Sequence, residues 1–153
     1  MKSLIPDDYR SKYHRARVNI LYSAIWINEY IRGFMEQFDL TPQQHNILRI
    51  IHRSDKPLNV LQIRDRMFEK LSDASRLIDR LELKGLVQKK KSVEDRRLVE
   101  ITLTEKGNAL TEKILEAIAE LDSPMKELNE EEADVLSELL MKMRKENCKQ
   151  IEQ

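Results

Sequence analysis

Residues 72–103 read SDASRLIDRLELKGLVQKKKSVEDRRLVEITL, and this stretch decides the fold. Apolar residues recur at helical spacing through 72–83, and Gly85 can end that helix in a left-handed conformation. After the glycine the period changes, because residues 86–91 and 98–103 are β-like and the second run alternates cleanly. The stretch therefore predicts a helix followed by a β-hairpin with a polar, charged tip.

The predicted helix 72–83 has two chemically different faces. Its back is apolar (Ala74, Leu77, Ile78 and Leu81), and its front carries short polar groups and arginines (Ser72, Ser75, Arg76 and Asp79, with Arg80 at the edge). Hydroxyls and amides at a helix start can approach phosphates, and arginine can reach base edges in the major groove. An ordinary amphipathic helix gives the same pattern, and three acidic residues (Asp73, Asp79 and Glu82) weigh against a DNA-reading helix taken by itself.

The predicted hairpin is basic and favours DNA more strongly. Three lysines (Lys89, Lys90 and Lys91) lead into a tip that holds Arg96 and Arg97, and arginine on a wing can enter the narrow minor groove. Asp95 is close enough in sequence to pair with Arg97 and fix its direction. Helix and hairpin together favour DNA binding over a merely solvated surface. The candidate DNA-binding residues are Ser72, Ser75, Arg76, Arg80, Lys89, Lys91, Asp95, Arg96 and Arg97.

Two further short helices precede this stretch. Thr41–Gln44 and Asn59–Gln62 are capping boxes, each with a cap residue followed three positions later by glutamine. Ser72 is predicted to cap the third helix. Three short helices followed by a hairpin are typical of a winged helix-turn-helix, here over residues 41–103.

Longer helices flank this lobe. One is predicted from about Tyr9 to Phe38; its apolar surface is wider than one stripe, and its length of roughly 45 Å exceeds what a small domain needs internally. A second copy of the chain is therefore a candidate partner. Two helices close the chain, and the last, starting at Asn129, is predicted to bury Val135, Leu136, Leu139, Leu140 and Met143. The predicted fold class is mainly α with a small β-hairpin wing.

Composition agrees with a helical, intracellular protein. The chain has 153 residues, of which 35% are charged and 41% hydrophobic, with only three glycines and four prolines. Its net charge of zero hides a basic segment (64–97) and an acidic one (104–153), which predicts one surface suited to a polyanion. The N-terminus has no apolar signal segment, the most apolar stretch is too short to cross a bilayer, and Cys148 is the only cysteine. We expect a cytoplasmic protein with no membrane contact.

Enzymatic constellations are missing from the sequence. The three histidines (His14, His45 and His52) are scattered without metal-ligand spacing, and the glycines stand alone rather than in a phosphate-binding loop. Cys148 has no neighbour that would suggest a nucleophile. The sequence predicts no catalytic residue, no metal and no cofactor.

The stretch 72–87 resembles the recognition helix and following turn of the MarR (multiple antibiotic resistance regulator) family. Asp95-Arg96-Arg97 and Leu103-Thr104-Glu105-Lys106-Gly107 resemble that family's Asp-x-Arg wing and Leu-Thr-x-x-Gly exit. The helix order is similar over nearly the whole chain. One departure is Gln62–Arg66, where the family more often has a Leu-Ala pair; Arg64 and Arg66 there could add contacts to the DNA backbone.

The resemblance implies a homodimeric, winged helix-turn-helix transcriptional regulator, usually a repressor, on a pseudo-palindromic operator of double-stranded DNA. It places the 72–80 front in the major groove and Arg97 in the minor groove, with Asp95 holding Arg97. It makes residues 8–38 and 104–150 dimerisation helices around the DNA-binding lobe 41–103. It also implies a small aromatic ligand, for which the candidate contacts are Trp26, Tyr30, Phe34 and His45, although core or dimer packing is the favoured role of each.

Two alternatives remain open on the sequence. The chain could be a dimeric ligand- or protein-binding module of the same fold that has lost DNA binding, which the zero net charge and the acidic residues of helix 72–83 favour slightly. It could also sense oxidants through Cys148, although a thiol in a polar tail is functionally idle by default.

Overall fold

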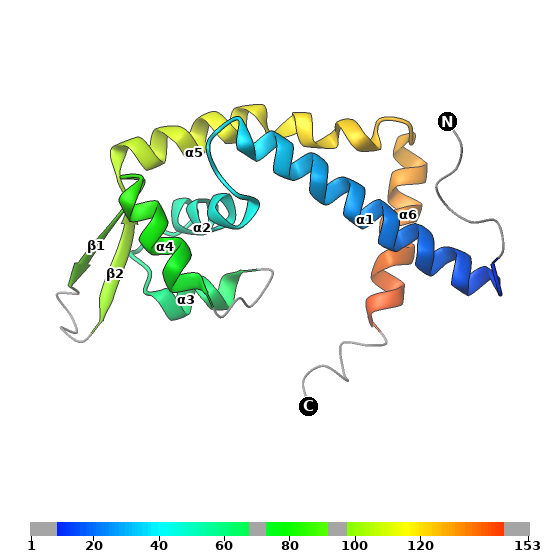
Figure 1. The fold of residues 1–153 in the computed structure, drawn as a ribbon, viewed down its shortest axis with the longest axis horizontal. Coiled ribbons are helices and arrows are strands. Elements are labelled where there is room, and N and C mark those ends of the chain that lie inside the picture. The colour runs from blue at the N-terminus through cyan, green and yellow to red at the C-terminus, as the bar shows by residue number, and fades with distance from the viewer. Residues whose placement is uncertain (1–8, 68–72, 92–97, 146–153) are drawn as a thin grey trace. The chain divides into compact units, whose positions relative to one another are not determined.

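The computed structural model describes residues 9–67, 73–91 and 98–145, so the predictions on Ser72, Asp95, Arg96, Arg97 and Cys148 lie outside the described residues. The chain forms two compact units, residues 1–118 and 119–153. The first unit contains α1 (Lys12–Glu36), α2 (Pro42–His52), α3 (Val60–Arg66), α4 (Ala74–Leu83), β1 (Val87–Lys91), β2 (Val99–Leu103) and α5 (Glu105–Ala117). This order confirms the predicted fold class of a mainly helical chain with a winged helix-turn-helix (Figure 1).

The capping boxes predicted at the starts of α2 and α3 are confirmed, because capping is local chemistry. At α2, the Gln44 amide donates to the Thr41 hydroxyl at 3.2 Å and the Thr41 amide donates to the Gln44 side chain at 3.0 Å. Asn59 and Gln62 form the same reciprocal pair at α3. Each box satisfies amides that the first turn of a helix leaves without a backbone partner.

The predicted cap of α4 is wrong at its start and right at its end. Asp73, not Ser72, occupies the N-cap position, and its side chain makes no capping bond. At the other end Gly85 has φ of 69°, its amide donates to Glu82, and the Leu86 amide donates to Leu81. These two bonds are the pattern that closes a helix on a left-handed residue, so the chain turns sharply from α4 into β1.

The wing is an antiparallel pair in which Val87 lies opposite Leu103 and Lys91 opposite Val99. A third segment adds to it, because Leu58 exchanges backbone hydrogen bonds with Ile101 at 2.8 and 3.3 Å. This bridge fastens the connection between α2 and α3 to the base of the hairpin. The position of the wing is therefore fixed by the helix-turn-helix itself.

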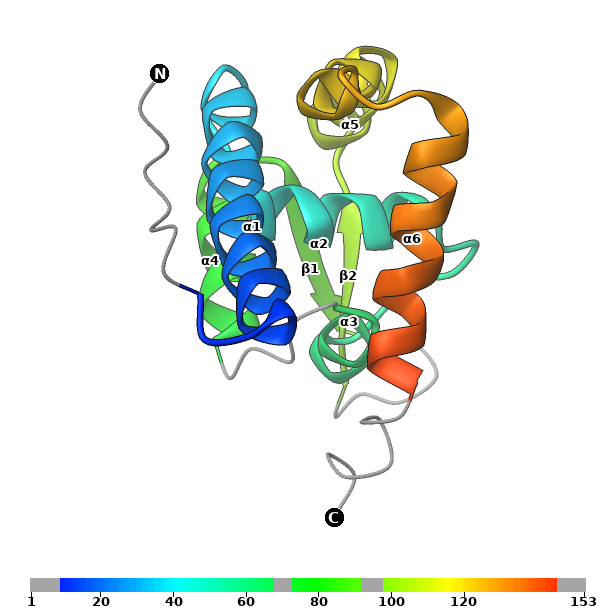
Figure 2. The same cartoon turned by 90° about the vertical axis from the view of Figure 1, so that its right-hand side faces the viewer.

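Helix α2 lies at the centre of the first unit and contacts α1, α3, α4, α5 and β2 (Figures 1 and 2). Each of those elements contributes apolar side chains to one core. Its fully buried members include Met35, Ile47, Leu48, Ile63, Ile78, Leu81, Ile101 and Ile114. The core therefore holds the helix α4 against the wing and the centre of the lobe.

The long first helix is shorter than predicted. It begins at Lys12, where the Ser11 hydroxyl accepts a bond from the His14 amide, and it ends at Glu36. Two residues beyond its C-cap, Asp39 takes a positive φ of 53°, which a non-glycine residue adopts at a cost. This turn redirects the chain from α1 into α2.

The second unit contains the 3-10 helix η1 (Ile118–Met125, from the last residue of the first unit) and α6 (Glu130–Lys145). The predicted cap of α6 is confirmed by reciprocal bonds between Asn129 and Glu132. The prediction that α6 buries its apolar face is wrong for the single chain, since Val135, Leu136, Leu139 and Met143 are 37–58% exposed. On α1, Leu21, Tyr22, Ile25 and Trp26 are similarly exposed, at 46–59%.

His45 is a buried titratable group in the first unit. Its side chain is 7% exposed, and its Nε2 has no hydrogen-bond partner among the described residues. Burial, and to a lesser extent the nearby charge of Arg49, lowers the pKa of His45 below its ordinary value of 6.5. The folded protein thus holds this ring neutral.

The lowered pKa predicts that the free energy of unfolding decreases as the pH falls below about 6.5, because the unfolded chain then binds a proton that the folded chain resists. Above that pH the effect vanishes, since both states keep the ring neutral. Urea unfolding of wild type and of His45→Leu measures this effect. A pH range of about 5 to 8 is suitable, because it brackets the ordinary histidine pKa. An unchanged pH profile in the variant would contradict this assignment.

Candidate nucleic-acid interface

The predicted DNA-reading face of α4 is open to solvent. Ser75, Arg76, Asp79 and Arg80 are all exposed, whereas Ala74, Ile78 and Leu81 on the opposite side are 0–1% exposed. Because the back is packed in the core, the helix cannot turn to hide its polar front. The structure therefore presents two guanidinium groups on a fixed surface.

The wing strand β1 is joined to α4 through Lys89. Its ammonium group forms ion pairs with the carboxylates of Asp79 and Glu82, the latter at 2.8 Å. The Lys89 side chain is 26% exposed, less than either acidic partner. The hydrogen bond to Asp79, followed by that to Glu82, raises the pKa of Lys89 above its ordinary value. We call these three residues the wing brace.

The other predicted lysine of the wing, Lys91, is exposed and lies two residues further along the same strand. Side chains alternate along a strand, so Lys89 and Lys91 share a face of the hairpin. No ion pair joins Lys91 to a residue within the described ranges. The two lysines therefore have the same formal charge and the same face, but different surroundings.

The Leu-Thr-x-x-Gly exit forms a tight joint behind the wing. The Thr104 hydroxyl donates to the Gly85 carbonyl at 2.7 Å and accepts from the Gly107 amide at 3.0 Å, and the Thr104 amide donates to the Leu86 carbonyl at 3.1 Å. A β-carbon on Gly107 would lie 2.8 Å from the Leu86 carbonyl carbon and closer still to its oxygen. The motif thus fixes the start of α5 against the turn that ends α4.

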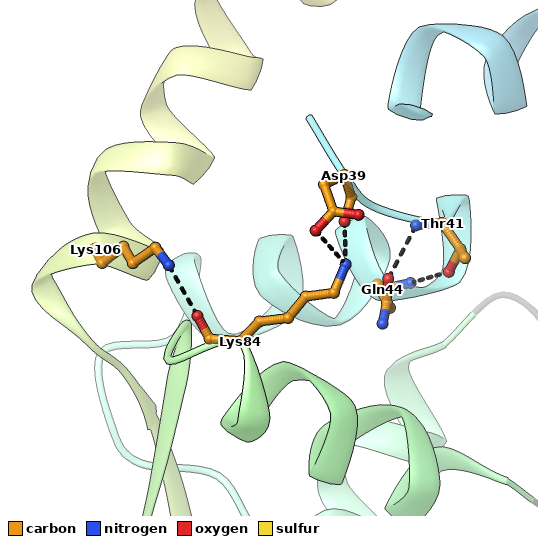
Figure 3. Close-up of polar contacts among 5 residues, drawn as sticks. All are labelled: Asp39, Thr41, Gln44, Lys84 and Lys106. Atoms are coloured by element: carbon orange, nitrogen blue, oxygen red, sulfur yellow. Dashed lines mark hydrogen bonds and ion pairs between the residues drawn. The ribbon is translucent and has the colours of Figure 1, made fainter. Parts of the chain in front are cut away.

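A second joint connects the same end of α4 to the turn after α1 (Figure 3). The Lys84 ammonium group donates to the Asp39 carbonyl oxygen and lies 2.9 Å from the Asp39 carboxylate. The Lys106 ammonium group, on α5, donates to the Lys84 carbonyl at 3.0 Å. We call these three residues the lysine clip. Sequence reasoning missed the clip because its members lie 22 and 45 residues apart.

The four residues predicted to line a ligand cleft differ in their exposure to solvent. Trp26 and Tyr30 on α1 are 53% and 37% exposed, whereas Phe34 at 4% and His45 belong to the buried interior. Phe34 packs against Phe38 with ring centroids 5.4 Å apart. Their role as ligand contacts stays a prediction.

The remaining basic candidates are Arg64 and Arg66, which are exposed near the end of α3. Arg64 lies 3.7 Å from the carboxylate of its neighbour Asp65. Across the described residues, no helix has both the length and the apolar character needed to span a membrane. The same part of the chain holds no cluster of three or more His, Cys, Asp or Glu side chains placed for a metal ion.

A helix-turn-helix, a two-stranded wing and an outward-facing helix with two arginines together define a winged helix-turn-helix protein of the DNA-binding class. Comparisons with known proteins agree with this class and narrow it. A sequence profile described as the MarR family matches residues 38–98. The HTH-type transcriptional regulator MhqR of Bacillus subtilis is 31% identical over 119 residues, covering 76% of this chain and 81% of its own.

Solved structures give the same result. A MarR transcription factor from Planctomyces limnophilus is 30% identical, with a TM-score of 0.66, covering 89% of this chain and 98% of its own. The Staphylococcus aureus MepR–DNA complex has the same fold, with a TM-score of 0.74 at 23% identity, covering 85% of this chain and 96% of its own. The chain belongs to the MarR family of transcriptional regulators and is not an enzyme.

Proposed function

We propose that this regulator acts in the cytoplasm as a homodimeric repressor on a pseudo-palindromic DNA operator. The observation that carries the proposal is the outward face of α4, where Ser75, Arg76 and Arg80 are exposed while the back of the helix is buried. Two such helices in a dimer would enter successive major grooves about 34 Å apart. The repressor would act by occupying the promoter.

The wing would contribute a second contact. The proposal places Arg97 in the minor groove beside the operator core, with Asp95 fixing its direction, and gives Lys91 and Arg96 contacts to the phosphates. Arginine is favoured in a narrow minor groove because the negative potential is enhanced there. The likeness to a regulator solved in complex with DNA supports this placement at the level of the fold.

The exposed apolar faces of α1 and α6 support the dimer. In the single chain, six large apolar or aromatic side chains of α1 and five of α6 are more than a third exposed. Contiguous apolar surface of this kind is uncommon on a monomer and marks protein interfaces. A second copy of this chain is the partner that the family resemblance implies. Release of DNA by a small aromatic ligand stays a prediction, with Trp26, Tyr30, Phe34 and His45 as its candidate contacts.

The testing experiment is fluorescence anisotropy of a labelled duplex from upstream of the protein's own gene, titrated at several salt concentrations beside a scrambled duplex. A sequence-specific regulator binds the first duplex more tightly and shows a steep negative slope of log affinity against log salt. Equal, weak binding to both duplexes, together with no sequence enriched in a selection from random DNA, would favour the alternative, a dimeric module that has lost DNA binding.

Replacing Arg76 or Arg97 with alanine is expected to weaken operator binding by about 1–3 kcal/mol while leaving the dimer intact. Arg76→Ala removes a base-edge contact and should also lower the preference for operator over scrambled DNA. Anisotropy measures both quantities, and sedimentation measures the dimer. Lys113→Ala, on the exposed side of α5, removes the same charge elsewhere and is the matched control. Wild-type affinity in Arg97→Ala would refute the assignment of the wing.

A further inference from the structure

The wing brace pairs the two acidic side chains of α4 with a lysine, so their negative charges oppose DNA binding less than the sequence alone indicates. Asp79 and Glu82 lie on the reading helix, where unpaired carboxylates would repel phosphates. Both instead bind the Lys89 ammonium group, Glu82 at 2.8 Å. Two of the three acidic residues that count against DNA binding in the sequence are thus partly neutralised by a lysine from the following strand.

The same geometry limits what Lys89 can do. An ammonium group has three N–H donors, and the Lys89 ammonium group already pairs with two carboxylates. To contact a phosphate directly, Lys89 would have to give up ion pairs with two acidic side chains. Lys91, on the same face and exposed, has no such competition from the described residues.

We infer that Lys89 is a positioning residue, which joins the wing to the reading helix through Asp79 and Glu82, and is not a phosphate contact. The inference rests on the proposed function, because it concerns how this chain binds an operator. Base-reading side chains on α4 and the wing must reach two different grooves at once. A direct link between the two elements fixes their relative direction before DNA arrives. Such preorganisation lowers the ordering cost of the operator complex, in which both elements must be engaged, and so favours operator over scrambled DNA.

The first test needs no DNA. In protein labelled with ¹⁵N at the lysine side chains, the ammonium resonance of Lys89 is assigned by its loss in Lys89→Met. We expect that resonance to move in the double variant Asp79→Asn/Glu82→Gln, which keeps the shape of both side chains and removes their charge. A resonance that stays in place would overturn the brace, whether or not the protein binds DNA. Adding operator to wild type should move the Lys91 resonance and leave that of Lys89 in place.

The second test uses binding. Lys89→Met and the double variant should each lower the ratio of operator to scrambled affinity by about two- to fivefold, the range expected when a small network of exposed ion pairs is lost. Lys89→Met should change the salt slope by much less than 1. Lys91→Met is the matched control and should reduce that slope by about 1 with little change in the ratio.

A phosphate contact at Lys89 predicts the opposite pattern. Lys89→Met would then lower the salt slope by about 1 as Lys91→Met does, and the double variant would bind both duplexes more tightly with an unchanged ratio. That result would overturn the inference and leave the proposed function standing. If wild type instead shows no preference for operator, the proposed function fails, and the resonance of Lys89 in DNA-free protein still decides whether the brace exists.

Discussion

Alanine at position 107 is expected to lower the free energy of unfolding by about 3–5 kcal/mol, a large part of the stability of a small domain. The added β-carbon would lie 2.8 Å from the carbonyl carbon of Leu86 and 3.2 Å from its α-carbon. Both contacts are with backbone, which no side-chain rotation can relieve. The start of α5 would have to move away and break the Thr104–Leu86 hydrogen bond.

Urea unfolding at a fixed protein concentration measures this effect. Gly33→Ala is the matched control, because a β-carbon there meets nothing within 4 Å and the position lies inside α1. Alanine has the higher helix propensity, so Gly33→Ala should leave stability unchanged or raise it by about 0.5–1 kcal/mol. Equal losses in the two variants would show that the close approach at Gly107 does not govern stability.

The second large effect is expected at the exposed face of α6. In the proposed dimer, Leu139→Asp would place a charge in an apolar interface on both subunits, and a symmetric interface counts each substitution twice. We expect the dissociation constant of the dimer to rise at least about 100-fold, with operator binding lost in parallel because both half-sites must be occupied. Analytical ultracentrifugation over a concentration series measures the first quantity and anisotropy the second.

Leu61→Asp is the control for this variant. Leu61 is 56% exposed on α3 and Leu139 is 58% exposed on α6, so the two substitutions change equally accessible leucines. The dimer should persist in Leu61→Asp. A Leu139→Asp protein that dimerises like wild type would show that this face of α6 is not the interface.

The sequence predicted those features that depend on near neighbours. Capping boxes at Thr41, Asn59 and Asn129 need residues only three positions apart, and the turn at Gly85 follows from a single residue that adopts positive φ freely. The alternation of β2 also indicates which of its faces is buried, the face on which Ile101 is fully buried. The predicted start of α4 is one residue early, because Asp73 occupies its N-cap position without a side-chain capping bond.

Features that depend on distant neighbours were missed or misread. The acidic residues Asp79 and Glu82 counted against DNA binding until their lysine partner on β1 was known. Helical spacing on α6 predicts that one face is apolar, but it does not say what covers that face; within one chain the face is exposed. The lysine clip has no local signature, since three segments must fold before its members meet.

That clip has a mechanical consequence. Lys84 is the last residue before the turn at Gly85, and its ammonium group binds Asp39 in the bend between α1 and α2. The Lys106 ammonium group, on α5, donates to the Lys84 carbonyl. The C-terminal end of α4 is thus held both to the bend after α1 and to α5. A displacement of the bend after α1 would be passed to the C-terminal end of α4 through the contacts of Lys84. The exposed side chains of Arg76 and Arg80 would then be displaced together, because both belong to this one helix.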